Sequence, residues 1–219
     1  ARNTILPILS DKLYELKFGL SVVPEFLREG NALDDFMNPD KIVIGGSDEN
    51  NIIFVKKIFQ NFKDKCEFIE TSLESAELIK YTNNAFFSML ISFSNEIANI
   101  TEKIPGVDSH EILKALVSDK RITSIINNER IVPSLESYLI PGCGFGGSCF
   151  PKDVQAILDY ANKNKIKTPL LKAILEINAE RPNKMVILSE SILGTLKNKK
   201  VSSWTFTKLN IFFKPTLVE

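Results

Sequence analysis

The sequence has little of several residues on which common enzyme chemistry depends. It holds one histidine, His110, and three cysteines, Cys66, Cys143 and Cys149, among 219 residues. A single histidine weakens any His-based triad or zinc hydrolase interpretation, although other bases can take its place. Three cysteines cannot all pair in disulfides, and their spacing is not that of a zinc site. We therefore expect no metal centre and a reducing compartment.

Net charge and long apolar runs are absent as well. Lysine and arginine number 27, and aspartate and glutamate also number 27. This balance predicts neither a nucleic-acid partner nor an anionic membrane partner. No apolar run approaches the length of a bilayer span, and the opening ARNTILPILSDK lacks the layout of a signal peptide. We therefore expect a cytoplasmic, globular chain with one large or two small domains.

The most distinctive segment that is present is PGCGFGGSCFPKD, residues 141–153. It holds two of the three cysteines and four of the ten glycines. A helical pattern starts at Asp153, which would place Cys149 just before a helix N-terminus. The helix dipole and nearby Lys152 would both favour a thiolate there, so Cys149 is a candidate nucleophile. The segment is equally compatible with a glycine-rich turn that holds a small buried thiol.

The first seventy residues alternate between strand and helix signals. Short apolar runs at 16–23, 41–46 and 66–70 predict strands. Asp48 is a candidate cap for a helix over 50–62, with an apolar stripe made by Ile53, Phe54, Ile58 and Phe62. This alternation predicts an α/β fold, although no G-x-G-x-x-G fingerprint precedes it.

The clearest helix begins at Thr71-Ser72-Leu73-Glu74, which has the pattern of a capping box. About thirty residues follow, enough for a rod of roughly 45 Å that could join two domains or pair with a second subunit. Its expected apolar face consists of Ala76, Ile79, Phe86, Leu90, Phe93, Ile97 and Ile100. Lys80 and Asn84 lie one turn apart beside that face. They either point into one site or are a solvated lysine and a tolerated asparagine.

Three more helices are predicted further along the chain. Asp108 begins one of them, and His110 in its first turn is expected at the surface rather than in a catalytic role. Thr168 and Pro169 are a good N-cap and first residue for a helix over 170–180. Another helix is expected over 183–193, with Gly194 at its end. The tail, 197–219, has neither clean alternation nor caps and does not look like a finished domain.

Several of these segments together resemble one enzyme family. The segment PGCGFGGSCFPKDV is similar to the active-site loop of the UDP-glucose dehydrogenase branch of the nucleotide-sugar dehydrogenases. PEFLREG at 24–30 and PDKIVIG at 39–45 resemble the family's PEFLREG…PDRIVIG block. Residues 77–84 and 93–98 resemble its central-helix signature of Lys, Asn and NE-x-A, and 119–122 its D-x-RI segment. Thr4 and Pro7 resemble its T-V-x-P-G turn, with Ile8 in place of the glycine. These blocks lie in the family's order across about residues 2–200.

The resemblance implies a function and a mechanism. The family oxidises the primary alcohol of a UDP-sugar twice with NAD, through a thiohemiacetal and a thioester on a cysteine. It implies a C-terminal part of a Rossmann-like NAD domain, then a mainly helical central dimerisation domain with a long connecting helix. The implied catalytic residues are Cys149, Lys80, Asn84, Asp153, Glu25 and Thr4. Glu29 and Lys152 are implied on the cofactor side. The implied UDP-sugar contacts are Phe26, Leu27, Lys80, Asn84, Tyr138, Gly146 and, in a homodimer, Arg121 reaching the neighbouring subunit's ligand.

Departures from the family pattern leave alternatives open. The half of the Rossmann domain that carries G-x-G-x-x-G is missing before Thr4, and the UDP-binding domain stops near its first strand. We expect an NAD-domain remnant at 1–70, a central domain at 71–182 and an incomplete UDP domain at 183–219. The segment 122–138 is longer than in short members. Ser148-Cys149-Phe150 favours UDP-glucose over the N-acetylmannosamine branch, which has G-G-H-C here. A GDP-mannose dehydrogenase, or an inactive remnant that only dimerises, remains an alternative.

Overall fold

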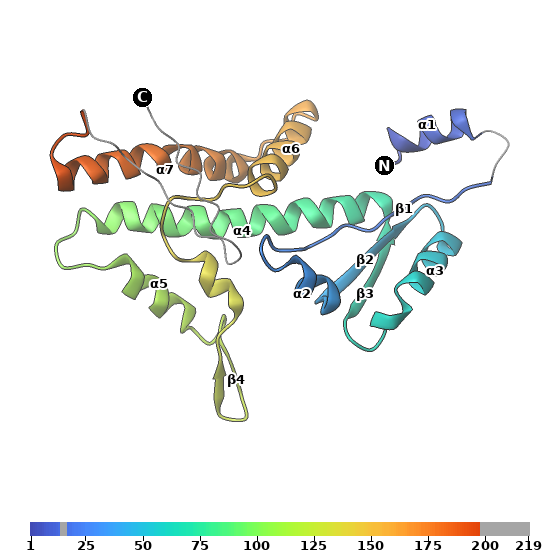
Figure 1. Cartoon of the computed structure of the whole chain (residues 1–219), viewed down its shortest axis with the longest axis horizontal. Coiled ribbons are helices and arrows are strands. Elements are labelled where there is room, and N and C mark those ends of the chain that lie inside the picture. Colours follow the sequence, from blue (N-terminus) through green and yellow to red (C-terminus); the bar gives the residue numbers. More distant parts are fainter. Residues whose placement is uncertain (14–16, 198–219) are drawn as a thin grey trace. The chain divides into compact units, whose positions relative to one another are not determined.

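The computed structural model describes residues 1–13 and 17–197 (Figure 1). The chain divides into two compact units, one that includes Ala1–Lys80 and one that begins at Tyr81. The observed boundary therefore falls inside the long helix α4, Leu73–Thr101. The domain limits expected from the sequence stay predictions, and 198–219 lies outside the described residues.

The first unit is built on a three-stranded sheet with the order β1-β2-β3 (Figure 1). Strand β1 is antiparallel to β2, whereas β2 and β3 are parallel, in register from Lys41 opposite Glu67 to Gly46 opposite Ser72. A parallel pair needs a crossover, which helix α3 supplies. The elements are α1 (Ile5–Lys12), β1 (Ser21–Val22), α2 (Ala32–Met37), β2 (Lys41–Gly46), α3 (Glu49–Ile58), η1 (Gln60–Phe62) and β3 (Glu67–Ser72). The α/β architecture expected from the sequence is confirmed.

Helix α3 confirms its predicted cap but not its predicted apolar face. Asp48 is the N-cap, and its carboxylate accepts a hydrogen bond from the backbone N–H of Asn51. The predicted stripe faces solvent instead, with Ile53, Phe54 and Ile58 exposed at 45%, 67% and 65%. Apolar residues lie on more than one side of this short helix, so the periodicity could not decide which of them would face the sheet.

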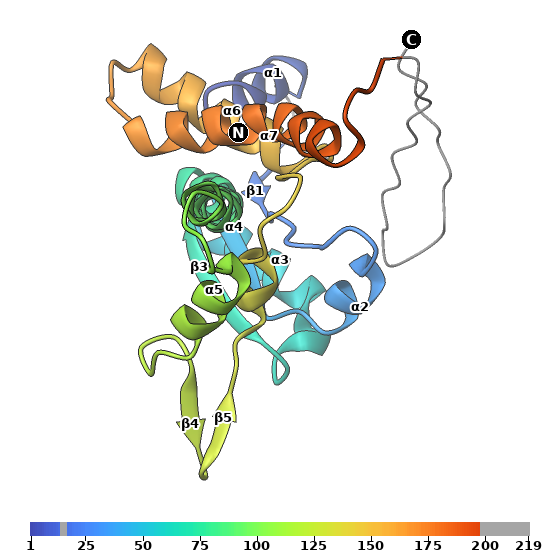
Figure 2. The same ribbon diagram turned by 90° about the vertical axis from the view of Figure 1, so that its left-hand side faces the viewer.

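The second unit is mainly helical. Its elements are the larger part of α4, then α5 (Ser109–Val117), β4 (Ser124–Ile126), β5 (Glu129–Ile131), η2 (Ser134–Tyr138), α6 (Phe150–Lys163) and α7 (Pro169–Leu193). Helices α4 and α7 lie side by side in both views (Figures 1 and 2). The Ser92 hydroxyl on α4 donates to the Ile174 carbonyl on α7 at 3.1 Å. Such a bond to a backbone carbonyl requires a close approach of the two helices.

The buried face of α4 differs from the one that its periodicity predicts. Small and polar side chains fill that face, namely Asn84, Ala85, Ser88, Ser92, Asn95 and Ala98. Phe86, Phe93 and Ile100 are exposed at 47%, 40% and 54%. The periodicity was real, but three large residues of the face that it marks are not covered by the described residues of this chain. The helix starts one residue later than expected, since the Ser72 hydroxyl accepts from the backbone N–H of Ser75 at 3.1 Å.

Two predicted helices are one. Helix α7 runs without a break through Pro182, so the expected division between 170–180 and 183–193 was wrong. Proline removes one backbone donor and often kinks a helix, which made it look like a boundary. Pro169 does occupy the first turn, but the Thr168 hydroxyl makes no capping bond and is buried without a partner among the described residues.

A small apolar core joins α4, α6 and α7 in the second unit. Ala85, Phe145, Val154 and Ile174 form its buried centre, and Val154 is fully buried. The partly buried residues packed against it are Met89, Ile91, Phe150, Leu171 and Leu175. Phe145 comes from the glycine-rich segment, so this core fixes part of that segment in place.

The long segment between Ile122 and Tyr138 contains a β-hairpin that projects from its unit (Figure 2). Strands β4 and β5 are antiparallel and exposed throughout. Asn127 and Asn128 join them with φ angles of 51° and 63°. Positive φ at both turn residues is the requirement of the type I′ hairpin turn, and asparagine tolerates it best after glycine. No helix among residues 1–13 and 17–197 is long and apolar enough to cross a membrane.

Candidate functional site

Cys149 lies where the sequence predicts, at the N-cap position of α6. Its side chain is exposed, which excludes the interpretation as a small buried thiol. The Ser148 hydroxyl lies 3.7 Å from its sulfur. The backbone N–H of Asp153 donates to the Cys149 carbonyl, so the residue is held at the first turn of the helix. An exposed thiol at a helix N-terminus has the access that a nucleophile needs.

Asn84 and Asp153 form a buried pair one helical turn beyond the cysteine. Both are nearly inaccessible, at 4% and 3% exposed, and the Asn84 amide donates to the Asp153 carboxylate at 2.6 Å. The ammonium of Lys152 lies 3.3 Å from the other carboxylate oxygen and is itself largely exposed. Hydrogen bonding and charge attraction from Asp153 raise the pKa of Lys152 above its usual value. The carboxylate is therefore held between an amide from α4 and a cation from its own helix.

Lys80 and Glu25 form the corresponding pair in the first unit. The Lys80 ammonium lies 3.2 Å from a Glu25 oxygen, and the other oxygen accepts from the Leu27 backbone N–H at 2.7 Å. The ammonium groups of Lys41 and Lys80 lie over the Phe26 ring, 4.5 and 5.5 Å from its centroid. Both contacts are cation–π interactions, so the Phe26 ring stabilises the two lysine side chains near Glu25.

Helix α4 carries one member of each pair. Lys80 closes the first unit and Asn84 lies four residues later, in the second unit. Residues four apart lie on the same side of a helix. That both side chains point into one site stays a prediction.

The remaining predicted residues of the first unit are exposed. Thr4 is the N-cap residue of α1 and makes no side-chain capping bond. Leu27 is 38% exposed, and Glu29 is exposed just before the turn at Gly30. The predicted partnership of Thr4 with Asp153 links the two units and stays a prediction.

Arg121 projects into solvent from the segment before the hairpin. Its side chain is 85% exposed and is tied to Asp119 by two hydrogen bonds, at 2.7 and 3.0 Å. The guanidinium lowers the pKa of the Asp119 carboxyl to about 2, mainly through the side-chain hydrogen bond. A preorganised, exposed guanidinium is suited to an anionic group on another molecule.

Tyr138 and Gly146 differ in their surroundings. The Tyr138 ring stacks on Phe87 of α4, with centroids 4.4 Å apart, and lies 6.5 Å from the ring of Phe150. A side chain at Gly146 would meet nothing within 4 Å. The first is therefore part of an aromatic cluster, and the second lies beside open space.

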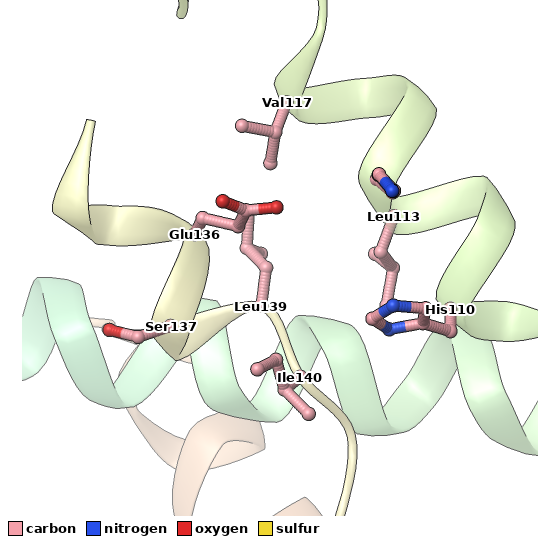
Figure 3. Close-up of a pocket in the computed structure, with 8 residues that line it drawn as sticks. His110, Leu113, Val117, Glu136, Ser137, Leu139 and Ile140 are labelled. Carbon is pink, nitrogen blue, oxygen red and sulfur yellow. The ribbon is translucent and has the colours of Figure 1, made fainter. Parts of the chain in front are cut away.

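A shallow pocket of about 210 Å³ lies between α5 and the end of η2 (Figure 3). Leu113, Val117, Leu139 and Ile140 give it an apolar wall, and His110 and Glu136 lie at its polar edge. None of the predicted site residues lines it. Across residues 1–13 and 17–197, no group of three or more His, Cys, Asp and Glu side chains gathers as a metal site would.

Sequence reasoning missed a set of polar residues beneath the cysteine loop, which we define as residues 141–149. Asn178 and Arg181 on α7, with Asn95 on α4, bind the backbone of this loop. Asn95 belongs to a segment that already stood out by resemblance. Asn178 and Arg181 are three residues apart on one helix. This spacing indicates no function until the structure shows that the loop lies over them.

Comparison with known proteins agrees with this architecture. The central-domain model of the UDP-glucose/GDP-mannose dehydrogenase family matches residues 74–180. The NAD-binding-domain model of the same family matches residues 1–63, which indicates NAD as the cofactor. The two matches lie in chain order and together cover most of the sequence.

Individual relatives give the same result. A UDP-glucose 6-dehydrogenase of Rickettsia bellii is 39% identical over 91% of this chain and 43% of its own length. UDP-glucose 6-dehydrogenase AglM of Haloferax volcanii is 37% identical over 90% of this chain and 42% of its own. The structure of a UDP-glucose dehydrogenase from Pyrobaculum islandicum superposes with a TM-score of 0.75 at 34% identity, over 91% of this chain and 41% of that one. The chain spans less than half the length of these relatives, and it belongs to the UDP-glucose/GDP-mannose dehydrogenase family.

Proposed function

We propose that this chain carries the thiol chemistry of an NAD-dependent oxidation of UDP-glucose to UDP-glucuronate, with Cys149 as the nucleophile. The observation that carries the proposal is the exposed Cys149 thiol at the N-terminus of α6, one turn before the buried Asn84–Asp153 pair. The names of the relatives support the choice of substrate. The Ser148-Cys149-Phe150 sequence favours the same substrate, with a GDP-sugar as the alternative.

The thiol acts on the aldehyde that follows the first oxidation. The Cys149 thiolate attacks the aldehyde carbon, a carbon–sulfur bond forms, and the carbonyl electron pair moves onto oxygen. The second oxidation converts this thiohemiacetal into a thioester, and water then breaks the carbon–sulfur bond and regenerates the thiol. Covalent capture retains the reactive aldehyde between the two oxidations.

Asn84 and Lys80 are the donors for the oxyanion. One N–H of the Asn84 amide is used by Asp153, which leaves its second N–H for a ligand. Lys80 brings a positive charge on the same side of α4. Donors placed before the reaction stabilise a developing oxyanion without reorganisation. Glu25 and Asp153 are the carboxylates that accept and return protons, with Thr4 helping to position water.

NAD, when bound, accepts the hydride in each oxidation. Glu29 and Lys152 are the residues that we propose on its side. The strand-to-helix turn between β2 and α3 does not fit a phosphate. A side chain at Gly46 would meet Ile52 at 2.4 Å, so this glycine serves packing, and the carboxylate of Asp48 already occupies the helix N-terminus.

A second copy of the chain is the proposed partner for the uncovered face of α4. Phe86, Leu90, Phe93, Ile97 and Ile100 recur at alternating steps of four and three, the repeat of a helix that packs against another helix. Three of them are exposed by 40% or more in the single chain. Phe93→Glu is expected to shift the chain from dimer to monomer in light scattering. Glu96→Gln, at an exposed position outside this repeat, is the matched control.

Arg121 serves the neighbouring subunit's UDP-sugar in this proposal. Its exposed guanidinium is free of the core and reaches outward. Mixing a Cys149→Ser chain with an Arg121→Ala chain should then restore activity that neither has alone, because a mixed dimer contains one intact site. If each site were built from one subunit, mixed dimers would stay inactive.

Reduction of NAD by the purified chain is the decisive test. UDP-glucose should give absorbance of NADH, two equivalents for each UDP-glucuronate, and Cys149→Ser should abolish the turnover. GDP-mannose under the same conditions separates the GDP-sugar alternative. Neither NADH nor NAD binding, with dimerisation intact, would instead support a chain that acts only as a dimerisation module.

A further inference from the structure

The cysteine loop rests on α7 through hydrogen bonds to its backbone. The Asn178 side chain makes two of them, both to Phe145. Its amide oxygen accepts from the Phe145 N–H at 2.7 Å, and its amide nitrogen donates to the Phe145 carbonyl at 2.9 Å. Two residues on neighbouring β-strands exchange N–H and C=O bonds in the same pattern. A single side chain therefore fixes both the position and the orientation of the peptide at Phe145. The Phe145 ring, 8% exposed, is buried in the core below.

A second anchor holds the loop at Gly142. The Asn95 amide oxygen accepts from the Gly142 N–H at 2.8 Å, and the Arg181 guanidinium donates to the Gly142 carbonyl at 2.9 Å. Arg181 also donates to the Asn99 side chain at 3.0 Å. It is only 3% exposed, and no carboxylate in the described parts of the chain forms an ion pair with it. A buried cation held by neutral oxygens is costly, so its place beneath the loop indicates a specific role.

Gly144 shows how closely the loop and α7 approach between these anchors. It has a φ of +84°, and a side chain there would meet the Asn178 amide oxygen at 2.3 Å and Arg181 at 3.0 Å. No other residue type fits such a contact in this conformation. Gly142, two residues earlier, has open space where its side chain would be. The two glycines therefore form a matched pair for substitution.

We propose that Asn178 and Arg181 are positioning residues that hold the cysteine loop so that Cys149 lies at the N-terminus of α6. The proposal rests on the function proposed for Cys149. Only residues 146–148 separate Cys149 from the anchored Phe145. On its other side, Cys149 continues into α6, which the Asn84–Asp153 bond ties to α4. Cys149 thus lies between two fixed points of the chain, Phe145 and α6, and α7 holds the first of them.

Hydrogen exchange measured by NMR on the 219-residue chain tests the anchors directly. Asn178→Leu should speed exchange of the Phe145 amide proton about tenfold, the factor that loss of one hydrogen bond gives. Exchange at Gly142 should change less, because Asn95 still accepts from it. Asn183→Leu makes the same change at an exposed asparagine of α7 and should affect neither amide.

Alkylation of Cys149 by iodoacetamide tests the consequence for the thiol. A Cys143→Ser background leaves Cys149 as the exposed thiol, and mass spectrometry of the peptide follows its modification. At pH 7, Asn178→Leu and Gly144→Ala should each slow alkylation at least threefold, because the sulfur then leaves the exposed position that it holds at the N-terminus of α6. Gly142→Ala, with its open space, should leave the rate unchanged.

These outcomes separate positioning from simple loss of stability. Asn178→Asp keeps the acceptor for the Phe145 N–H and removes only the donor, so it should fall between the parent chain and Asn178→Leu. Unchanged alkylation in Asn178→Leu and Gly144→Ala, in chains with parental helix content, would overturn the proposal. So would equal effects of Gly144→Ala and Gly142→Ala. Slowed alkylation in a chain that reduces no NAD would leave the positioning role standing and refute the proposed function alone.

Discussion

Asn84→Asp replaces the buried amide beside Asp153 with a group of nearly identical shape and different charge. The Asn84 nitrogen lies 2.6 Å from the Asp153 carboxylate, and both residues are less than 5% exposed. Two carboxylates at that separation would repel by roughly 6 kcal/mol at an effective dielectric constant of about 20. Protonating the new carboxyl instead costs about 1.4 kcal/mol for each pH unit above its ordinary pKa of about 4, or about 4 kcal/mol at pH 7. Protonation costs less free energy than the repulsion between two carboxylates. The new carboxyl is therefore protonated, and its O–H donates a hydrogen bond to Asp153 where the amide N–H did.

The result is a pH-dependent loss of stability. Because the pKa of the new carboxyl is raised in the folded state, the variant keeps parental stability below about pH 4 and loses it as pH rises. We expect a destabilisation of about 1.4 kcal/mol at pH 5 and about 4 kcal/mol at pH 7. Urea unfolding followed by far-ultraviolet circular dichroism measures this difference, since the affected unit is mainly helical.

A matched control variant and one contrary result test the predicted pH dependence of Asn84→Asp. Asn162→Asp adds the same charge at an exposed position on α6 and should change stability by no more than about 0.5 kcal/mol at any pH. A penalty for Asn84→Asp that is equal at pH 5 and pH 7, or smaller at pH 7, would refute the reasoning. It would mean that solvent reaches the pair or that the two side chains separate at little cost.

Three further predictions follow from the same contacts. Val154→Ala should lower the unfolding free energy by about 2–3 kcal/mol in denaturant titrations, because a fully buried side chain loses two methyl groups and leaves a cavity. The Asp119 carboxyl should titrate near pH 2 by NMR and return toward pH 4 in Arg121→Ala, so its stabilising contact is present at neutral pH and lost only in strong acid. Cys66 should be alkylated more slowly than the two exposed thiols at pH 7, because burial raises its pKa.

The sequence predicted helices and strands well where a few neighbouring residues determine the backbone conformation. The strands β2 and β3 lie over the short apolar runs at 41–46 and 66–70, and Asp48 caps α3 as its side chain requires. Cys149 lies at the end of α6 because proline at 151 and the apolar pattern after it start a helix there. Each of these depends on a few neighbouring residues, so no distant contact was needed to infer them.

Periodicity failed where the buried face of a helix was not its most apolar one. On α4, the large residues Phe86, Phe93 and Ile100 are exposed, whereas Ser88, Ser92 and Ala98 are buried. The Ser92 hydroxyl is bonded to the neighbouring helix α7. Small residues carry little hydrophobic signal, yet they allow the close approach that buries them. On α7, Pro182 looked like a boundary, but the helix continues through it. Which face is covered depends on the packing partner, and that is a property of the fold.

The sequence by itself determined where the candidate nucleophile lies, because a thiol in a glycine-rich segment before a helix is a local arrangement. It also determined the family, whose blocks follow one another in order along the chain. Only the tertiary structure decided what holds that thiol. Asn178 and Arg181 lie about thirty to forty residues beyond the loop that they bind, and their contacts are made to backbone atoms. Backbone atoms are alike at every position, so no residue type in the loop indicates which side chains bind it.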